Sequence, residues 1–372
     1  MVIVNQPLQA LQNWIADENI DVAYISNPTN ILYFSGFESD PEERVLALFV
    51  FPDQDPFLFT PQLEVEAAKE AGWPYDVYGY LDHEDAFAII GNEIRKRNPD
   101  PTQWAIEKDD LPVQRYEAVL TQFPNASFPA DASRFIEQLK LIKTPDEIAI
   151  MEAAGRQADY AFKIGFEAVR TGRTEQEVVA EIEYGLMKKG VMHTSFPTIV
   201  QAGVDAADPH GAPTQAKIEP NELILFDLGT VNRGYMSDAT RTIAYGTPSD
   251  KALDIYKVCL EAQLTAQDAI KPGLTAAELD QIGRSVIEKA GYGEYFIHRL
   301  GHGIGTSTHE FPSIMEGNNM ELQPGMCFSI EPGIYIPGVA GVRIEDCVHV
   351  TENGSEPFTH TSKELLTIEP RN

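Results

Sequence analysis

Four acidic residues of this chain form two pairs whose spacing brings carboxylates together. Asp227 closes the apolar run 223–227, and Asp238 lies in a second run, 235–242. The segment between them, Val-Asn-Arg-Gly at 231–234, predicts a hairpin turn. If the turn centres on the middle of this segment, the two aspartates face each other with Cβ atoms about 4.5–5.5 Å apart. Carboxylates that close repel each other unless a cation lies between them.

A second acidic pair has the same symmetric spacing. Glu331 ends the run 327–331, and Glu345 ends the run 342–345. Each glutamate lies seven residues from Gly338, in the turn-forming segment that separates them. A hairpin that turns at Gly338 therefore brings the two glutamates face to face. A single acid at a strand end is more often a loop cap or a salt-bridge partner, but two opposed acid pairs in one region favour a metal site.

Histidines supply the remaining donors. His302 lies in the Gly-His-Gly-Ile-Gly sequence 301–305, whose glycines let the backbone approach a ligand closely. His309 follows seven residues later, and His210 occurs in the sequence Asp-Pro-His-Gly. An isolated histidine is usually a satisfied core or surface residue. Five others have no such context and are expected to be structural: His83, His193, His298, His349 and His360.

This donor set indicates the kind of metal. One imidazole and four carboxylates suit two hard or borderline divalent ions better than an ion that prefers thiolates. Manganese is the first choice, and zinc or cobalt are alternatives. The cysteines are odd in number and widely spaced, which argues against a disulfide framework and a cysteine-based zinc site. They are expected to be reduced core thiols: Cys259, Cys327 and Cys347.

Helix signals around these strands repeat along the chain. The capping box, a threonine N-cap followed three residues later by glutamate, occurs as Thr144 with Glu147, Thr174 with Glu177, and Thr275 with Glu278. The last two copies begin at Gly172 and Gly273 and share glycine, threonine and glutamate at the same relative positions. This match, offset by 101 residues, predicts an internally duplicated helical layer, although capping boxes are common and chance could also supply it.

The N-terminal part alternates helix-like and strand-like segments, which predicts a separate α/β domain. The expected elements are helices over 8–16 and 65–71 and strands over 22–25 and 45–51. The segment 127–133, with Pro129, is the expected boundary, and a connecting helix is expected over 135–142. We therefore predict an N-terminal domain over residues 1–128 and a second domain, carrying the acidic pairs, over residues 129–372.

Length and composition exclude several classes of protein. A chain of 372 residues with 43% apolar and 23% charged residues has the make-up of a globular protein of two or three domains. Its 57 acids and 28 bases give a net charge of −29, which repels nucleic acid and anionic membranes, so neither is expected as a partner. Since there is no long apolar run and no basic leader, we expect a cytoplasmic location.

The order of the candidate ligands resembles that of the creatinase and methionine aminopeptidase superfamily, which has the pita-bread fold. The likeness rests on Asp227, Asp238, His302 in Gly-His-Gly-Ile-Gly, Glu331 in Ser-Ile-Glu-Pro-Gly, and Glu345 in Val-Arg-Ile-Glu-Asp. Within this superfamily the chain is similar to the bacterial prolidases, or Xaa-Pro dipeptidases, over nearly its whole length. The similar segments include Tyr-Phe-Ser-Gly-Phe at 33–37 and Phe-Thr-His-Thr at 358–361.

This resemblance implies an α/β N-terminal domain and an α+β pita-bread catalytic domain with an internal pseudo-two-fold repeat, commonly in a homodimer. It also implies metal-dependent hydrolysis of Xaa-Pro dipeptides, in which two divalent ions share a water and lower its pKa. Asp227 and Asp238 would bind one face of the metal pair. His302 would complete the coordination of one metal ion, and Glu345 would bridge both ions. Glu331 would bind a metal and also carry the water's proton to the leaving nitrogen.

The resemblance extends to residues around the metals. His210 and His309 would contact the substrate and stabilise the tetrahedral oxyanion. Arg343 would orient either the metal ligand Glu345 or the substrate. Many prolidases carry an arginine four residues after the histidine at position 309, where it can hold the dipeptide's carboxylate, and here that residue is Ser313. We expect Arg299, just before the metal loop, to supply this charge instead.

Three alternatives remain open. An Xaa-Pro aminopeptidase that trims longer peptides shares the fold, the metals and the histidines, and kinetics on tripeptides would separate it from a dipeptidase. A metal-free enzyme of the creatinase type lacks the full ligand set, and a non-catalytic binding protein would be expected to have lost ligands or histidines. Separately, the acidic stretch 38–44 is either a solvated loop or a flap that closes over the site and limits peptide length.

Overall fold

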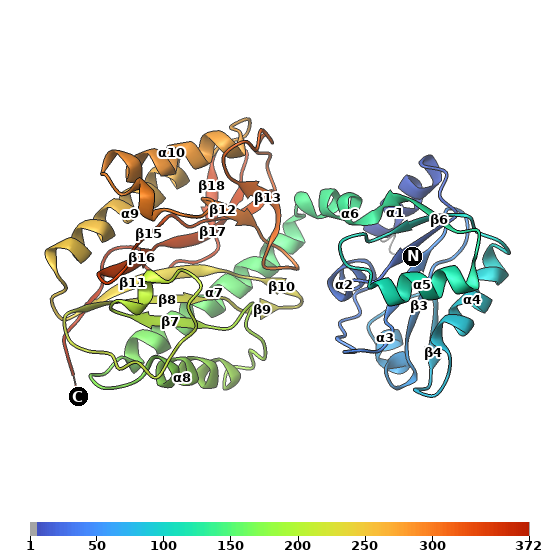
Figure 1. Ribbon diagram of the computed structural model, residues 1–372, viewed down its shortest axis with the longest axis horizontal. Helices are drawn as coiled ribbons and strands as arrows, with labels where there is room; N and C mark the ends of the chain where they lie inside the picture. Colours follow the sequence, from blue (N-terminus) through green and yellow to red (C-terminus); the bar gives the residue numbers. More distant parts are fainter. Residues whose placement is uncertain (1–5, 372) are drawn as a thin grey trace. The chain divides into compact units, whose positions relative to one another are not determined.

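Two compact units make up the chain. The computed structural model describes residues 6–371, and the first unit extends to Leu139 while the second begins at Lys140 (Figure 1). The sequence-based boundary between residues 128 and 129 falls inside a strand of the first unit. Pro129 is tolerated there because this strand lies at the edge of its sheet and contains a pairing irregularity.

The first unit is an α/β domain built on a six-stranded sheet in the order β4-β3-β2-β1-β5-β6. Strands β1, β2 and β3 pair antiparallel, and the outer pairs are parallel. The strands are β1 (Val22–Ile25), β2 (Ala47–Val50), β3 (Phe57–Pro61), β4 (Asp76–Tyr80), β5 (Gln103–Ile106) and β6 (Ser127–Asp131). The helices are α1 (Gln6–Asp17), α2 (Pro28–Ser35), the short 3-10 helix η1 (Gln62–Glu64), α3 (Val65–Glu70), α4 (Ala86–Arg97), α5 (Val113–Gln122) and α6 (Ala132–Leu141).

The central strands of this sheet are continuous apolar runs because both faces of the sheet are buried. Every residue of β1, β2 and β3 is buried, and a separate apolar cluster covers each face of the sheet. Helix α2 begins after Asn27, whose side chain accepts hydrogen bonds from the backbone N–H groups of Thr29 and Asn30. The helices and strands expected for this domain coincide with α1, α3, β1 and β2 to within a few residues.

The second unit is an α+β domain whose main sheet runs in the order β13-β12-β14-β17-β11-β8-β7, with β18 paired to β17 and β19 to β11. The helices are α7 (Pro145–Ala168), α8 (Glu175–Met187), α9 (Asp250–Ala269) and α10 (Ala276–Lys289), with 3-10 turns η2 (Asp205–Ala207) and η3 (Gly293–Tyr295). The strands of the main sheet are β7 (Ile199–Ala202), β8 (Glu222–Leu228), β11 (Ala239–Tyr245), β12 (Gly301–Gly303), β13 (Glu310–Ile314), β14 (Cys327–Ile330), β17 (Glu345–Val350), β18 (Ser355–Pro357) and β19 (Thr367–Ile368). Two small hairpins complete it: β9 (Val231–Asn232) with β10 (Tyr235–Met236), and β15 (Gly333–Ile336) with β16 (Ala340–Arg343). No helix among the described residues is both long and apolar enough to cross a membrane.

The two halves of the second unit repeat one arrangement. Strands β7, β8 and β11 pair antiparallel in one half, β12, β14 and β17 do so in the other, and β11 pairs with β17 at the centre. Each half has its own helix pair, α7 with α8 and α9 with α10, packed through a separate apolar cluster. Gly172 N–H donates to the carbonyl of Ile218, and Gly273 N–H donates equivalently to that of Leu322. The predicted internal duplication is therefore confirmed.

The predicted pairing of the two aspartates is wrong by two residues. Arg233 and Gly234 have positive φ angles of 49° and 81°, so they form the centre of the two-residue turn between β9 and β10. This turn lies one residue later than the sequence suggested. As a result Asp227 stands opposite Thr240 in the ladder between β8 and β11, and Asp238 is the residue just before the start of β11.

The register predicted for the glutamate hairpin is correct. Ile336 pairs with Ala340 around the turn at Gly338. In the main sheet Ile330 pairs with Asp346, which is symmetric about the same residue. Glu331, the next residue after β14, therefore lies at the level of the first residue of β17, which is Glu345.

Candidate metal centre

A cavity of about 410 Å³ opens in the second unit, within the range typical of small-molecule sites. All five predicted ligands line it: Asp227, Asp238, His302, Glu331 and Glu345. The two aspartates come from β8 and from the residue before β11, which belong to the first half of the repeat. The other three residues come from β12, the end of β14 and β17, in the second half. The cavity therefore lies where the two halves meet.

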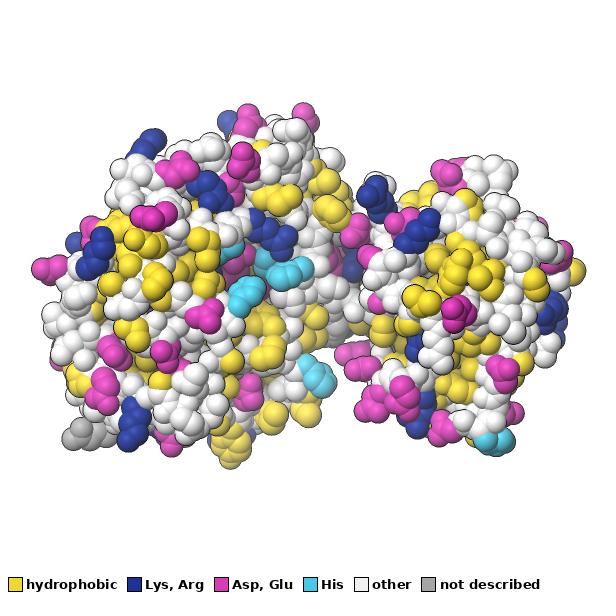
Figure 2. Space-filling view, in the orientation of Figure 1, with side chains coloured by type: hydrophobic (Ala, Val, Ile, Leu, Met, Phe, Trp, Pro, Cys, Tyr) yellow, Lys and Arg dark blue, Asp and Glu magenta, His cyan; other side chains and the backbone are white. Residues whose placement is uncertain are grey.

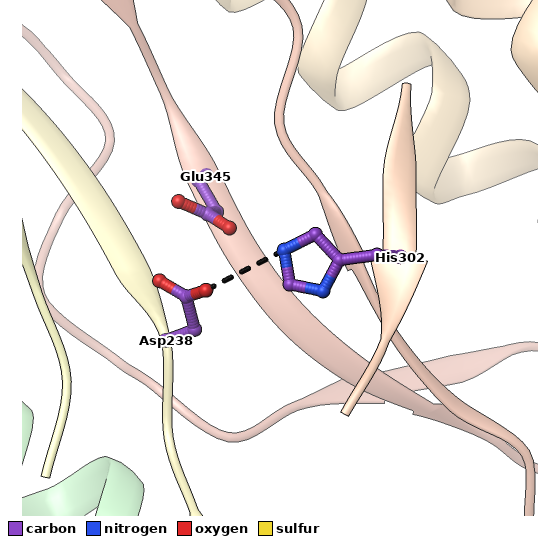
Figure 3. A group of neighbouring side chains, drawn as sticks. All are labelled: Asp238, His302 and Glu345. Atoms are coloured by element: carbon purple, nitrogen blue, oxygen red, sulfur yellow. Dashed lines mark ion pairs between the residues drawn. The ribbon is translucent and has the colours of Figure 1, made fainter. Parts of the chain in front are cut away.

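Three of these side chains lie close enough to share one cation. Asp238, His302 and Glu345 each offer a ligand atom, and these atoms lie within 4.8 Å of one another. Figure 3 shows their carboxylate and imidazole groups directed toward a common space. His302 Nε2 lies 3.6 Å from Asp238 Oδ2 and 3.2 Å from Glu331 Oε1, so Glu331 borders the same space.

Unpartnered oxygens line the cavity. Asp227 Oδ1, Asp238 Oδ1 and Glu345 Oε1 are buried and accept no hydrogen bond from any described residue. Burial and the charge of Glu345 raise the pKa of Asp238 well above its usual range, and burial and the charge of Glu331 do the same for Glu345. Buried carboxylates without partners are costly, and oxygen-rich sets of this kind bind divalent cations. The residues present therefore fit divalent metal ions.

Arg343 organises the remaining oxygens of two of these acids. It donates a hydrogen bond from Nη2 to Asp227 Oδ2 and another, 3.1 Å long, from Nε to Thr240 Oγ1. Thr240 Oγ1 in turn donates to Glu345 Oε2 at 2.6 Å. The arginine thus contacts Asp227 directly and is linked to Glu345 by hydrogen bonds through Thr240.

Two further histidines line the cavity. The rings of His309 and His302 meet edge to face, with centroids 4.2 Å apart. Burial and the neighbouring His302 lower the pKa of His309 to about 4, and burial lowers that of His302 to about 4 as well. Both rings are therefore neutral near pH 7 and can bind a cation or exchange hydrogen bonds. His210 reaches the cavity from the exposed segment that follows β7 and η2.

Arg299 and Ser313, the two positions considered for binding a carboxylate, are neighbours. Arg299 lines the cavity, and its Nη1 donates to Ser313 Oγ at 2.9 Å. Ser313 lies in β13, directly opposite His302 in β12. The serine therefore links the guanidinium group to the residue opposite His302 in the sheet.

Sequence reasoning missed His298, which was expected to be structural but lines the cavity. Its Nε2 lies 3.0 Å from the hydroxyl of Tyr335, and its Nδ1 lies 2.7 Å from the carbonyl oxygen of Arg299. Tyr335 also accepts a hydrogen bond from Arg343. The available signal was the position of His298 beside Arg299 and four residues before His302. Other wall residues that the sequence did not indicate are Phe196, Ile199, Pro209 and Thr308.

The acidic stretch 38–44 belongs to the first unit, between α2 and β2. Ser39 donates to Glu64 at 2.8 Å, and Arg44 pairs with Asp82 at 2.8 Å. Both contacts lie within the first unit. The role of this stretch as a flap stays a prediction.

Comparison with known proteins assigns the chain to a family. The model of metallopeptidase family M24 matches residues 149–352, and that of the creatinase/prolidase N-terminal domain matches residues 7–142. This chain belongs to metallopeptidase family M24, with an N-terminal creatinase/prolidase domain and a pita-bread catalytic domain.

Individual relatives narrow the comparison. The chain is 59% identical over 362 residues to an Xaa-Pro dipeptidase of Lactobacillus helveticus, covering 97% of this chain and 98% of that protein. The solved structure of an Xaa-Pro dipeptidase from Bacillus anthracis is 35% identical, with a TM-score of 0.90 over 98% of this chain and 99% of that one. An X-Pro aminopeptidase from Thermotoga maritima is 29% identical, with a TM-score of 0.85 over 94% and 98%. Dipeptidases and an aminopeptidase therefore share this fold.

Proposed function

We propose that this chain is an Xaa-Pro dipeptidase, a prolidase, that hydrolyses the bond before proline in dipeptides with two divalent metal ions. The observation that carries the proposal is the set of five donors that line one cavity, three of which carry a buried oxygen that accepts no hydrogen bond from any described residue. The 59% identity to the Lactobacillus helveticus dipeptidase over nearly the whole chain supports the same substrate class.

The ions would be held by the five donors: Asp227, Asp238, His302, Glu331 and Glu345. Bound divalent ions supply Lewis-acid activation of the attacking water and of the substrate carbonyl. Carboxylate oxygens with a single imidazole favour manganese, and zinc or cobalt are alternatives. Treatment with a chelator should abolish hydrolysis of Leu-Pro, and adding back Mn²⁺, Zn²⁺ or Co²⁺ separately would identify the metal that gives the highest kcat/KM.

Glu331 is the residue we assign to proton transfer. Its Oε1 lies 3.2 Å from His302 Nε2 and accepts a hydrogen bond from Ser329 Oγ at 2.9 Å, so the carboxylate has a fixed orientation beside the ligand space. It would take a proton from the attacking water and return it to the leaving nitrogen. Proline nitrogen carries no hydrogen in the peptide, so this protonation is needed before it departs as an amine.

His210 and His309 are the residues we assign to the substrate carbonyl. Both line the cavity, and the ring of His309 lies against that of His302. A neutral imidazole can donate one hydrogen bond, which stabilises the negative oxygen that develops as water adds to the carbonyl. Because this oxygen is charged only near the transition state, loss of either histidine should lower kcat more than it raises KM.

Arg299, which lines the cavity and donates a hydrogen bond to Ser313, is the residue we assign to the free carboxylate of the dipeptide. A charged hydrogen bond of this kind contributes about 1.5–3 kcal/mol, so Arg299→Ala should raise KM for Leu-Pro on the order of 10–100-fold. Arg156, an exposed arginine of α7, provides the control, because Arg156→Ala should leave KM unchanged. An unaltered KM in Arg299→Ala would show that another group binds the carboxylate.

An Xaa-Pro aminopeptidase is the second candidate, favoured by the likeness to the Thermotoga maritima enzyme. Hydrolysis of Leu-Pro should be compared with that of Leu-Pro-Pro in the presence of Mn²⁺. Cleavage of the dipeptide alone would support the dipeptidase. Release of leucine from the tripeptide at a comparable rate would assign the chain to the aminopeptidases, and no cleavage of either would favour a binding protein.

We also propose that the enzyme is a cytoplasmic homodimer. The dimer is supported by the family resemblance, and a reducing compartment fits the three free, buried cysteines. Light scattering on the purified protein should give about 82 kDa, twice the chain mass of 41.2 kDa. Cell fractionation would test the location.

A further inference from the structure

A buried ion triad lies behind the segment that carries His309. Glu310, the next residue, pairs with two lysines: Lys140 Nζ lies 2.9 Å from Oε1, and Lys143 Nζ lies 2.9 Å from Oε2. The side chains are only 10% (Lys140), 2% (Lys143) and 7% (Glu310) exposed. Charges buried this deeply persist only where close pairing and further hydrogen bonds satisfy them, so the groups around the triad are held in a defined geometry.

The backbone before His309 folds around this carboxylate. Oε1 of Glu310 accepts hydrogen bonds from the N–H of Thr306 at 2.9 Å, from its hydroxyl at 3.1 Å, and from the N–H of Ser307 at 3.1 Å. Gly305 packs so closely that a Cβ there would lie 2.5 Å from Glu310 Oε2. The segment 304–310 therefore has little freedom while the carboxylate stays in place.

The lysine end of the triad is attached to the main sheet. The backbone N–H of Lys143 donates to the carbonyl of Gly325 at 2.9 Å, and Ile142 forms a β-bridge with Met326, the residue before β14. Strand β14 leads directly to Glu331, one of the proposed metal ligands. Lys143 is thus attached to the part of the main sheet that carries Glu331. Glu310 links the segment that contains His309 to this same part of the sheet.

We propose that Glu310, together with Lys140 and Lys143, is a positioning residue that holds the His309 ring against His302. The catalytic consequence rests on the proposed dipeptidase function, in which His309 contacts the transition state. A glutamine at position 310 keeps the size of the side chain and can still accept hydrogen bonds from the loop backbone. It cannot hold two ammonium groups as a carboxylate does, so the link through Lys140 and Lys143 to the main sheet is lost.

Kinetics of the holoenzyme provide the first test. Glu310→Gln should lower kcat for Leu-Pro about 10–100-fold and leave KM within about twofold, because a misplaced His309 weakens a contact made in the transition state. In a His309→Ala background the same substitution should have almost no further effect on kcat. Losses that multiply in the double variant would overturn the proposal, since Glu310 would then act through another residue.

A matched control comes from the first unit. Glu93 in α4 pairs with Lys96 at 2.7 Å, and the glutamate side chain is 10% exposed, so Glu93→Gln removes a glutamate–lysine pair of the first unit, none of whose described residues lines the cavity. This variant should leave kcat and KM unchanged. If Glu93→Gln lowered kcat as Glu310→Gln does, the effect would be general and the positioning proposal would be refuted.

A readout independent of activity separates this proposal from the dipeptidase proposal. In Zn²⁺-loaded protein with ¹⁵N-labelled histidine, Glu310→Gln should shift the imidazole resonances of His309 and leave those of His83, in the first unit, unchanged. Unchanged His309 resonances would overturn the positioning proposal even in an active dipeptidase. Shifted resonances in a protein that cleaves no dipeptide would support positioning and refute the enzymatic function instead.

A milder variant covers the case in which Glu310→Gln does not fold. Lys140→Met removes one ammonium group and leaves the pair between Lys143 and Glu310 in place. It should shift the His309 resonances and lower kcat in the same direction by a smaller factor. No change in either measurement would count against the proposal.

Discussion

Replacement of Asp238 by asparagine should stabilise the metal-free protein while destroying its metal site. Asp238 is 5% exposed, and its Oδ1 accepts no hydrogen bond from the described part of the chain. Burial, together with the charges of Glu345, Asp227 and Glu331, raises its pKa well above the usual range. Asparagine has the same shape without the charge, so it removes both the desolvation cost and the repulsion.

The size of this effect follows from the burial. Asparagine also leaves an oxygen without a partner, so the substitution removes only the part of the cost that is due to the charge. Because an unpartnered charged group costs more than the roughly 1–3 kcal/mol of a neutral one, the free energy of unfolding of the metal-free second unit should rise by about 2 kcal/mol. For a domain of this size, 1 kcal/mol shifts Tm by about 2–4 °C, which gives an increase of about 4–8 °C. Manganese should reverse the order, because only the wild type binds it: at a hundredfold excess over Kd, binding contributes about 2.7 kcal/mol.

Differential scanning calorimetry in chelator and in Mn²⁺ would test both halves of this reasoning. The pH dependence has a definite sign. Because the folded-state pKa of Asp238 is raised, its protonation favours the metal-free fold at low pH, and this contribution is lost as pH rises through the folded value. The advantage of asparagine should therefore be absent below about pH 3.9, where Asp238 is protonated in the unfolded chain as well, and should grow as pH rises above that value. A metal-free Asp238→Asn protein that melts below the wild type at neutral pH would refute the argument.

Three further outcomes are expected. Despite burial, Lys143 and Lys140 lower the pKa of Glu310 to about 2 from 4.5, so the triad should contribute about 3 kcal/mol above pH 4.5 and lose it as pH falls toward 2. The difference in free energy of unfolding between wild type and Glu310→Gln, from urea titrations, should narrow across that interval. Gly155→Ala would place a Cβ 2.0 Å from the carbonyl oxygen of Phe358, and a drop of about 1–3 kcal/mol is expected in the same titrations. Thr240→Val removes the hydroxyl that orients Glu345 and should weaken Mn²⁺ binding about 10–100-fold in calorimetric titrations, with the wild-type fold retained in circular dichroism.

Local sequence patterns predicted the strand register correctly where it depends only on a turn and the two strands beside it. The symmetry of the glutamate hairpin about Gly338 predicted the level of Glu331 and Glu345 correctly. The aspartate hairpin failed by two residues because its turn places Arg233 at a positive φ of 49°. An arginine does not signal that conformation, whereas asparagine or glycine would have done so.

Contacts between distant parts of the chain could not be predicted in this way. Glu310 meets Lys143 across 167 residues, and Arg343 meets Asp227 across 116. Neither periodicity nor a capping signal records such pairs. His298 was overlooked for a related reason, since its partner Tyr335 lies 37 residues later in the sequence, in β15.

The pairing of β11 with β17 joins the two halves of the second unit, and this pairing has a consequence for the order in which the protein folds and binds metal. Two of the proposed ligands belong to the half made first and three to the half made later, so a partly folded chain offers only fragments of a site. Closing these long loops is slow compared with forming local structure. We therefore expect metal ions to bind late, after both halves have folded. The bound ions would then link the two repeated halves of the second unit.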